Sequence, residues 1–248
     1  MSTSQRVSDT WLAGKNIDPE LLKPLDAAFD SIPDVIDAFA NDEFVIVLDS
    51  PDRENEGDLI IAASALTTEK AAFMIRYTSG YICVPMPTQR CAELGLEPMV
   101  TKNQDPHRTA YAITVDANHP DITTGISAHD RALTCRQLAN PQSKPSDLRR
   151  PGHIVPLHAR PGGVRERKGH TEAAVDLCLL ARKQPVGAIC EIVRDGEPVK
   201  GKPEFRNSGM MRRDECLAFG KEFGIKVCTI EDLYRFWQAV DGASNITA

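Results

Sequence analysis

The stretch FVIVLDSPDRENEGDLIIAA, residues 44–63, joins two apolar runs through a highly charged connection. Each run is short and rich in Val, Ile and Leu, which is typical of a buried β-strand. We expect the first strand at residues 43–48, and the second begins at Leu59. The charged residues 49–58 are therefore predicted to form a strand-to-strand loop.

The carboxylates of this loop have a spacing that suits a metal ion. Glu54, Glu56 and Asp58 alternate along the chain, so an extended backbone would project all three to one side. Like charges held together are unfavourable unless a cation or the neighbouring Arg53 compensates them. Hard oxygen ligands favour Mg²⁺ or Mn²⁺. The alternative is an ordinary solvated turn, which is the common role of charged residues between strands.

Outside this stretch, helical and strand patterns are mixed along the chain. Expected helices start at Ser31, an N-cap ahead of Pro33, and cover residues 67–78, 86–96, 127–138, 173–181 and 230–240. Further strands are expected at 81–84, 110–116, 187–193 and 225–228. A loop rich in Pro and polar residues is expected at 140–153, and a Pro- and Gly-rich loop at 149–163. Because there is no internal repeat and no regular β–α alternation, we predict an α+β fold, a three-layer single domain with a mixed β-sheet flanked by helices.

Residues 1–30 differ from the rest of the chain. They are polar, contain Pro19 and Pro24, and show little sustained periodicity. We expect an N-terminal extension that is partly ordered, followed by a single catalytic domain at residues 31–248. No second catalytic domain is expected after residue 240.

The composition excludes several classes of function. A net charge of -6 and a pI near 5.6 argue against a surface that binds nucleic acid. No apolar window reaches the length of a membrane span and the N-terminus lacks a signal-peptide region, so we expect a cytoplasmic protein without membrane contacts. The seven cysteines include no Cys-x-x-Cys pair, which predicts reduced thiols rather than a disulfide framework.

The segment RERKGHTEA, residues 165–173, is a second candidate site. Arg165, Arg167 and Lys168 precede an expected helix start, where free amides and the helix dipole favour an anion such as a phosphate. His170 and Thr171 add a nitrogen and a hydroxyl at the same turn. A solvated basic face and a structural histidine are the alternatives. The His-x-Glu pattern is not a zinc deaminase site, because no Pro-Cys-x-x-Cys follows it.

Three weaker signals complete the set. DITTGISAHDR, residues 121–131, offers hydroxyls before a helix, and we expect helix capping more than a phosphate cradle. His153 and His158 lie in the expected loop at 149–163, where an imidazole can transfer protons. Glu191 interrupts an apolar strand, so it either pairs with a cation or faces a catalytic site.

Five motifs together resemble one enzyme family, 3,4-dihydroxy-2-butanone 4-phosphate synthase of riboflavin biosynthesis. They occur in the family's order between about residue 33 and residue 240: RENEGD at 53–58, TTGISAHDR at 123–131, RPGHIVPL at 150–157, GHTEAAVDL at 169–177 and FGIKVCTIEDL at 223–233. Each motif alone is weak, whereas five in order are highly specific. The resemblance implies an α+β fold and a homodimer with its sites at the interface. It also implies that D-ribulose 5-phosphate is converted to 3,4-dihydroxy-2-butanone 4-phosphate and formate.

The resemblance also assigns residues to roles. It implies Mg²⁺ or Mn²⁺, two ions per site, with Glu54 and His170 as protein ligands and His153, Glu191 and Asp49 as catalytic residues. The implied substrate contacts are Arg53, Asp58, Cys83, Thr109, Thr124, Arg167, Lys168, Gly169 and Thr171. Ser50 and Pro51 stand where the family loop is usually more acidic, and they bear on loop mobility and on the number of metal ions.

Two other functions fit parts of the sequence. A different metal-dependent sugar-phosphate isomerase or aldolase would use the same loop chemistry, and the release of formate distinguishes it. A nucleotide- or RNA-binding module would use TTG before a helix to hold a polyphosphate, but it needs neither Glu54 nor Glu191. Such a module would bind its ligand without turnover.

Overall fold

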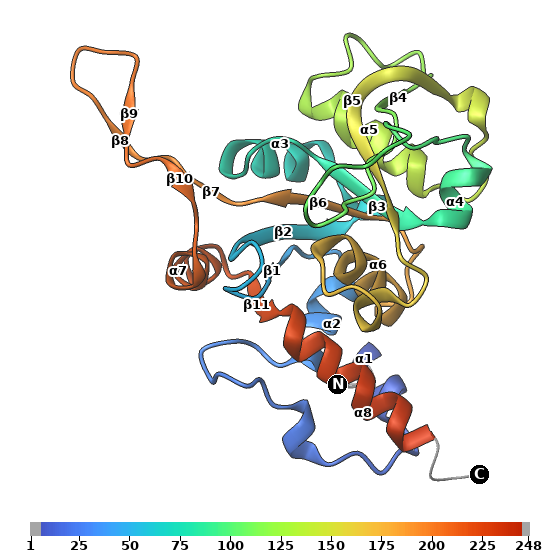
Figure 1. Cartoon of the computed structure of the whole chain (residues 1–248), viewed down its shortest axis with the longest axis vertical. Helices are drawn as coiled ribbons and strands as arrows, with labels where there is room; N and C mark the ends of the chain where they lie inside the picture. The colour runs from blue at the N-terminus through green and yellow to red at the C-terminus, as the bar shows by residue number, and fades with distance from the viewer. Residues whose placement is uncertain (1–5, 245–248) are drawn as a thin grey trace, which may run out of the picture.

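A mixed seven-stranded sheet forms the centre of the protein, for which a computed structural model describes residues 6–244 (Figure 1). The strand order is β11-β1-β2-β6-β3-β5-β4. The bounds are β1 (Val45–Leu48), β2 (Gly57–Ala62), β3 (Cys83–Pro87), β4 (Val115–Ala117), β5 (Leu148–Ala159), β6 (Gly187–Glu191) and β11 (Lys226–Thr229). The pairs β1–β11 and β3–β5 are parallel and the others antiparallel, which confirms the mixed sheet.

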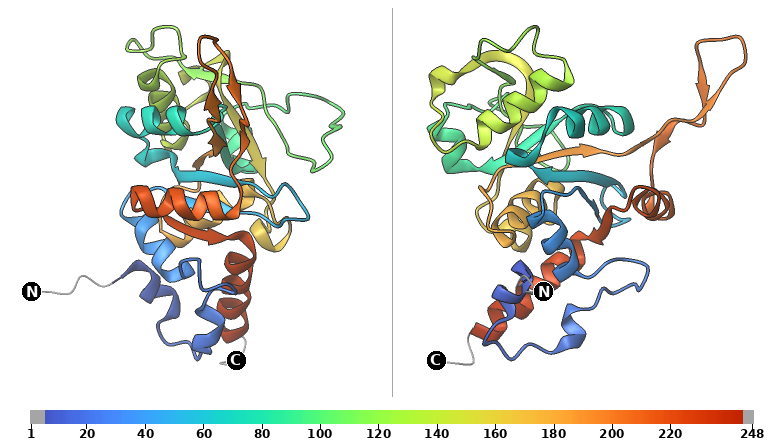
Figure 2. Two further views of the ribbon diagram at one scale, coloured as in Figure 1. Left: turned by 90° about the vertical axis from the view of Figure 1, so that its left-hand side faces the viewer. Right: turned by 180° about the vertical axis from the view of Figure 1, so that it is seen from behind.

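Helices cover both faces of this sheet, so the α+β layering is also confirmed. Helices α3 (Thr68–Tyr77) and α5 (Ala128–Ala139) lie on one face, and α2 (Ile32–Ala40), α6 (His170–Leu180) and α8 (Ile230–Ser244) on the other (Figures 1 and 2). The short α4 (Thr88–Glu93) follows β3, and α7 (Arg213–Phe223) packs on β1 and β11. No helix within residues 6–244 combines the length and apolarity needed to cross a membrane.

The elements around the opening stretch form as the sequence predicts. Every residue of β1 and β2 is buried, because the sheet is covered on both faces. The charged connection between them is a loop, as expected, but Gly57 and Asp58 belong to β2 and not to the loop. Ser31 and Ser127 act as N-caps, since their side chains accept hydrogen bonds from the amides of Asp34 and Asp130.

The prediction of a Pro- and Gly-rich loop at residues 149–163 is wrong. Most of this segment is the 12-residue strand β5, in which Pro156 pairs with Val84 of β3 and its carbonyl accepts a hydrogen bond from the Ala112 amide. Gly152 permits the crossing of β4, because a Cβ there would lie 2.0 Å from the Val115 carbonyl carbon. Tertiary pairing therefore overrides the local signal of proline and glycine.

Other boundaries shift for the same reason. The helix expected at 86–96 shrinks to α4, because Met86 and Pro87 complete β3. The strand expected at 110–116 reduces to β4, preceded by the isolated bridges Tyr111–Leu157 and Pro98–Ala112.

Residues 6–30 pack along α2 and α8. They contain α1 (Val7–Leu12) and the 3₁₀ turn η1 (Pro19–Leu22). Trp11 donates a 2.7 Å hydrogen bond to the Leu180 carbonyl and meets Trp237 edge to face, with the ring centroids 5.7 Å apart. The division of the chain at residue 30 into an extension and a catalytic domain stays a prediction.

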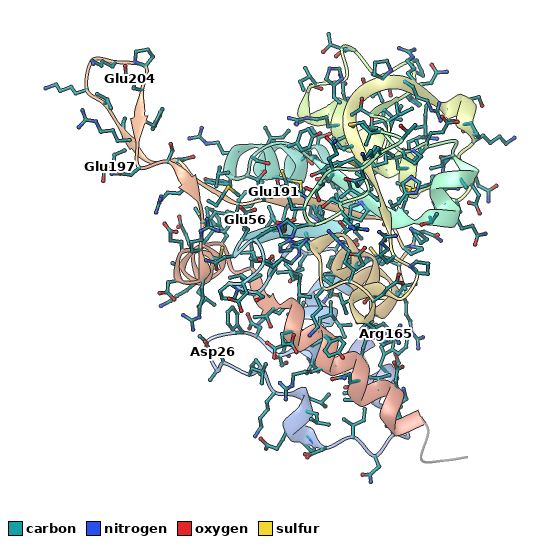
Figure 3. The ribbon with its side chains drawn as sticks, viewed as in Figure 1. Asp26, Glu56, Arg165, Glu191, Glu197 and Glu204 are labelled. Atoms are coloured by element: carbon teal, nitrogen blue, oxygen red, sulfur yellow. The ribbon has the colours of Figure 1, made fainter. Side chains whose placement is uncertain are left out.

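An arm at residues 193–210 projects from the molecule. It contains β7 (Val193–Arg194), β8 (Glu197–Pro198), β9 (Phe205–Arg206) and β10 (Gly209–Met210). Figure 2 shows the hairpin well away from the sheet, and Glu197 and Glu204 lie on it in Figure 3. The sequence analysis identified neither this arm nor α7.

Candidate active site

A cavity opens where the loop between β1 and β2 meets β6, β3 and the start of α6. Side chains from these four segments converge on it, among them Glu56 and Glu191, which are labelled in Figure 3. The lining residues are Arg53, Glu54, Glu56, Asp58, Cys83, Thr109, Tyr111, Leu157, Arg167, His170, Thr171, Ile189 and Glu191. Nine of them are predicted site residues, so most of the expected site comes together in space.

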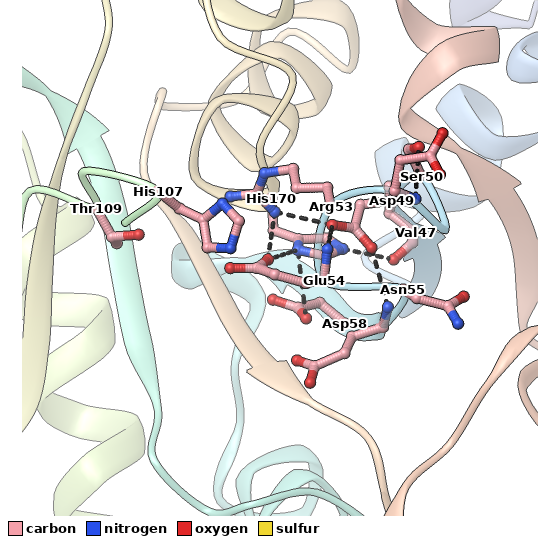
Figure 4. A network of polar contacts seen from close by, with 12 residues as sticks. Val47, Asp49, Ser50, Arg53, Glu54, Asn55, Asp58, His107, Thr109 and His170 are labelled. Carbon is pink, nitrogen blue, oxygen red and sulfur yellow. Dashed lines mark hydrogen bonds and ion pairs between the residues drawn. The ribbon is translucent and has the colours of Figure 1, made fainter. Parts of the chain in front are cut away.

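Three ligand atoms beside this cavity can hold a metal ion. One atom each of Asp49, Glu54 and His170 lies within 4.8 Å of the others (Figure 4). His170 Nε2 is 3.1 Å from the Val47 carbonyl oxygen, to which it must donate, so in the neutral imidazole the lone pair is on Nδ1. The sequence assigned Asp49 to catalysis, which stays a prediction, and one of its carboxylate oxygens also lies where it could be a third ligand.

The buried carboxylate of Asp58 also suits a bound metal ion. Its Oδ1 atom has no hydrogen-bond partner among the described residues and lies 3.6 Å from His170 Nδ1. An orphaned buried oxygen is costly unless a cation or water compensates it. Glu54 Oε2 is also 3.6 Å from His170 Nδ1. The donor set therefore fits Mg²⁺, which prefers oxygen ligands and keeps several waters or substrate oxygens.

The environment of the cavity shifts the pKa values of Asp58 and Glu54 in opposite directions. Burial raises the pKa of Asp58, and the charges of Glu191 and Glu54 add to that rise. Burial opposes ionisation of Glu54 too, but His170 and Arg53 outweigh it and lower its pKa to about 2. For His170 the burial penalty is exceeded by the pull of Asp58, Glu54 and Asp49, so its pKa is raised. A cation in this place would substitute for the imidazolium proton.

Asp49 also folds the loop that presents Glu54. Its carboxylate accepts hydrogen bonds of 2.9 Å from the amides of Glu54 and Glu56 and from Arg53 Nη1. Asn55 adopts a left-handed φ of 55°, which Asn tolerates better than most residues. The turn therefore places the three alternating acids on one side although its backbone is not an extended strand.

Glu191 faces the same cavity from the neighbouring strand. It pairs in register with Asp58 across the antiparallel β2–β6 ladder, which puts both carboxylates on one face of the sheet. Ser79 Oγ donates a 2.8 Å hydrogen bond to Glu191 Oε2. Cys83 lies beside them, and burial raises the pKa of its thiol, so it stays protonated.

Arg167 is a cation that lines the cavity from the segment before α6. Its Nη2 donates to Thr109 Oγ1 at 3.2 Å, and its Nη1 donates to Glu172 Oε2 at 2.6 Å. Gly169, the N-cap of α6, leaves room for this guanidinium, because a Cβ there would lie 2.2 Å from Arg167 Nη1. Thr171 lines the cavity from the first turn of α6. An anion bound here would meet a guanidinium and two hydroxyls.

The other two basic residues before α6 point elsewhere, so the prediction of one basic cluster is wrong. Lys168 pairs with Glu231 at 2.6 Å and lies over the Tyr234 ring. Arg165 pairs with Asp241 and lies over Trp237. Both side chains fasten α8 to the segment before α6.

His153 and Thr124 do not line the cavity. His153 Nδ1 lies 2.8 Å from Asp116 Oδ2, and Gly125 packs so closely that a Cβ would be 2.5 Å from Nδ1. Thr124 is exposed next to Gly125. These residues form a second cluster, Asp116, Thr124, Gly125 and His153. His158 instead binds the Leu96 carbonyl at 3.0 Å and is structural.

Four lining residues lie outside the predicted site: Glu56, Tyr111, Leu157 and Ile189. Glu56 was noticed for its alternation with Glu54 and Asp58 but was given no role. Tyr111 carried no local signal, because the bridge to Leu157 of β5 brings it to the cavity.

Comparison with known proteins shows which family the chain resembles. The profile of the 3,4-dihydroxy-2-butanone 4-phosphate synthase family matches residues 33–236. The Pyricularia oryzae enzyme of that name is 58% identical over 86% of this chain and 92% of its own length. The riboflavin biosynthesis protein RibBA of Rhodococcus erythropolis is 51% identical over 83% of this chain, which spans 46% of that longer protein.

A solved structure gives the same answer. A 3,4-dihydroxy-2-butanone 4-phosphate synthase in complex with two magnesium ions superposes with a TM-score of 0.85 at 58% identity, covering 87% of this chain and 100% of that one. These likenesses favour neither an isomerase or aldolase nor a nucleotide- or RNA-binding module. The chain therefore belongs to the 3,4-dihydroxy-2-butanone 4-phosphate synthase family, lyases that act on ribulose 5-phosphate in riboflavin biosynthesis.

Proposed function

We propose that the cavity converts D-ribulose 5-phosphate to 3,4-dihydroxy-2-butanone 4-phosphate and formate with the residues described above. The two products together contain the atoms of the substrate, so no oxidant or reductant is needed. The observation that carries the proposal is the meeting of Asp49, Glu54 and His170 beside Asp58 and Glu191. Such a set can bind a cation and move protons on neighbouring carbons of a sugar phosphate.

Glu54 and His170 would hold Mg²⁺, with Asp49 as a further ligand. When bound, the ion supplies Lewis-acid polarisation of substrate oxygens. The relative with two magnesium ions supports two ions per site here, and Mn²⁺ would fit the same oxygen and imidazole donors. Ser50 and Pro51 leave the ligands in place, because Asp49 still anchors the loop through the Glu54 and Glu56 amides.

The other residues bind the substrate and transfer protons. Arg167, Thr109 and Thr171 would hold the phosphate, because they place a guanidinium and two hydroxyls on one wall. Asp58 has a raised pKa in a buried position, so it can take up and return a proton near neutral pH. Glu191 faces it from β6 and would serve the next transfer, while Arg53 and Cys83 shape the pocket.

His153 and Thr124 would act in the cavity of a second copy of the chain. Within one chain, their cluster lies apart from the lining of the cavity, and Asp116 orients the imidazole. A two-fold homodimer can bring such a cluster to its partner's site. Lys168 and Gly169 then have supporting roles, Lys168 by fastening α8 and Gly169 by making room for Arg167.

The cytoplasm is the proposed location, since all seven cysteines are free and buried, as expected in a reducing compartment. The reaction is tested by incubating the purified protein with ribulose 5-phosphate, with and without Mg²⁺, and measuring formate. We expect equimolar formate and four-carbon phosphate with Mg²⁺, and none after chelation or in Glu54→Gln. A five-carbon isomer or a two- and three-carbon pair without formate would contradict the proposal.

A further inference from the structure

An arginine that follows the arm in the sequence, Arg212, hydrogen-bonds to the turn that carries Glu54. Arg212 Nη1 donates to the carbonyl oxygen of Glu54 at 3.0 Å and also contacts the carbonyl oxygen of Asn55. Among the described residues, Arg212 is the one side chain from outside residues 49–56 that hydrogen-bonds to the carbonyls of this turn. Asn55, whose carbonyl oxygen the guanidinium contacts, has a left-handed φ.

Arg212 is itself fixed by two contacts. Its amide donates to Glu215 Oε2 at 3.1 Å in a capping box at the start of α7. The preceding Met211 amide donates to the Ile192 carbonyl at 3.0 Å, next to Glu191. Glu215 Oε1 in turn accepts from Arg194 Nη1 of β7. One short segment therefore ties the strand that carries Glu191 to the turn that carries Glu54.

Figure 1 shows this arrangement, in which α7 lies beside the β1–β2 loop where the arm returns to the sheet. Inside the turn, the Asp49 carboxylate accepts hydrogen bonds from the amides of Glu54 and Glu56, and Figure 4 shows Asp49 beside Glu54. Outside it, Arg212 holds the carbonyls. The backbone amide and the backbone carbonyl of Glu54 are therefore both hydrogen-bonded, which restricts the position of its side chain.

We propose that Arg212 is a positioning residue that presets the Glu54 carboxylate for metal binding. The inference rests on the proposed metal site. A guanidinium bonded to backbone carbonyls makes charge-assisted hydrogen bonds, which are stronger than neutral ones. Groups that orient a metal ligand typically change metal affinity by about 10- to 100-fold when removed. Because Arg212 is exposed, we expect the lower end of that range.

Arg213 provides a matched control. It is also exposed and adjacent in sequence, but its guanidinium contacts Asp26 and Asp214 and lies 5.4 Å from the Phe29 ring centroid. The full-length Arg212→Ala and Arg213→Ala variants therefore remove the same charge from neighbouring positions. Since both side chains are on the surface, both variants should fold, and a thermal melt verifies it.

The test is a titration of each protein with Mn²⁺, followed by electron paramagnetic resonance of the free ion. Arg212→Ala is expected to raise the dissociation constant about tenfold, and Arg213→Ala to leave it unchanged. At saturating metal, kcat should be largely retained in Arg212→Ala, and amide exchange at residues 50–56 should be faster. Equal affinity in the wild type and Arg212→Ala, or an equal loss in Arg213→Ala, overturns the inference.

Glu54→Gln separates this result from the proposed site. If that variant loses Mn²⁺ binding while Arg212→Ala binds like the wild type, the metal site stands and the role of Arg212 is rejected. If the wild type and Glu54→Gln bind alike, the proposed metal site fails and the inference fails with it.

Discussion

The proposed chemistry of this protein depends on a few residues whose protonation is set by their neighbours. His170 donates through Nε2 to the Val47 carbonyl, and its Nδ1 faces the carboxylates of Glu54 and Asp58. Sequence spacing predicted Glu54, Glu56 and Asp58 as one group, because alternation is visible in a chain. The partnership with His170 is not local, so from the residues alone the metal site stayed one of two alternatives.

The raised pKa of His170 predicts how metal binding depends on pH. Without metal, the neighbouring carboxylates keep the imidazole protonated near neutral pH despite its burial. A cation needs the Nδ1 lone pair, so binding releases a proton and strengthens as the pH rises, by up to about tenfold per pH unit below that pKa. Calorimetric Mg²⁺ titrations in buffers of different ionisation enthalpy measure both effects. Constant affinity from pH 6 to pH 8, with no proton release, would exclude His170 as a ligand.

Glu191→Gln tests the second carboxylate. The amide keeps the shape and the contact with Ser79 but cannot take up a proton, so we expect turnover to fall about a hundredfold with little change in substrate binding. Steady-state kinetics and a thermal melt on one preparation check this. If the melting temperature falls sharply and turnover does not, Glu191 is a structural partner instead. Glu204→Gln, on the arm, is a suitable control for the loss of one surface charge.

At the scale of elements, the sequence predicts well where the signal is local. Caps at Ser31 and Ser127 and the apolar runs of β1 and β2 identify their elements directly. β5 was missed because Pro151, Gly152 and Pro156 resemble a loop, and its pairing with β3 and β4 decides otherwise. Prediction of the cavity lining from sequence is limited in the same way, since Tyr111 reaches the cavity through a bridge to β5.

The packing of α1 on the domain has a measurable consequence. Trp11→Phe removes the indole hydrogen bond to the Leu180 carbonyl and weakens the contact with Trp237, so we expect a loss of about 1–2 kcal/mol in the free energy of unfolding. The remaining tryptophan, Trp237, then reports unfolding in urea by fluorescence, as the chain has two. Leu21→Ala, at an exposed side chain of η1, is the control. A stability equal to that of the wild type would show that α1 contributes nothing to the fold.

At the scale of the whole molecule, most of the expected site residues fall into two groups. Glu54, His170 and most of the others surround the cavity, whereas His153 and Thr124 belong to the second cluster with Asp116. The family resemblance implies that both groups act in one reaction, but it does not say which copy of the chain supplies each group. The proposed homodimer joins them, with two sites that each use both chains.

Mixing two inactive variants tests this shared site most directly. Glu54→Ala and His153→Ala chains are combined, dissociated and reassociated, and formate release from ribulose 5-phosphate is measured while native mass spectrometry counts the heterodimers. With random pairing, half of the dimers are mixed and one of their two sites is whole, so we predict about a quarter of wild-type activity. If heterodimers form and the mixture stays inactive, His153 does not act in the cavity of its partner.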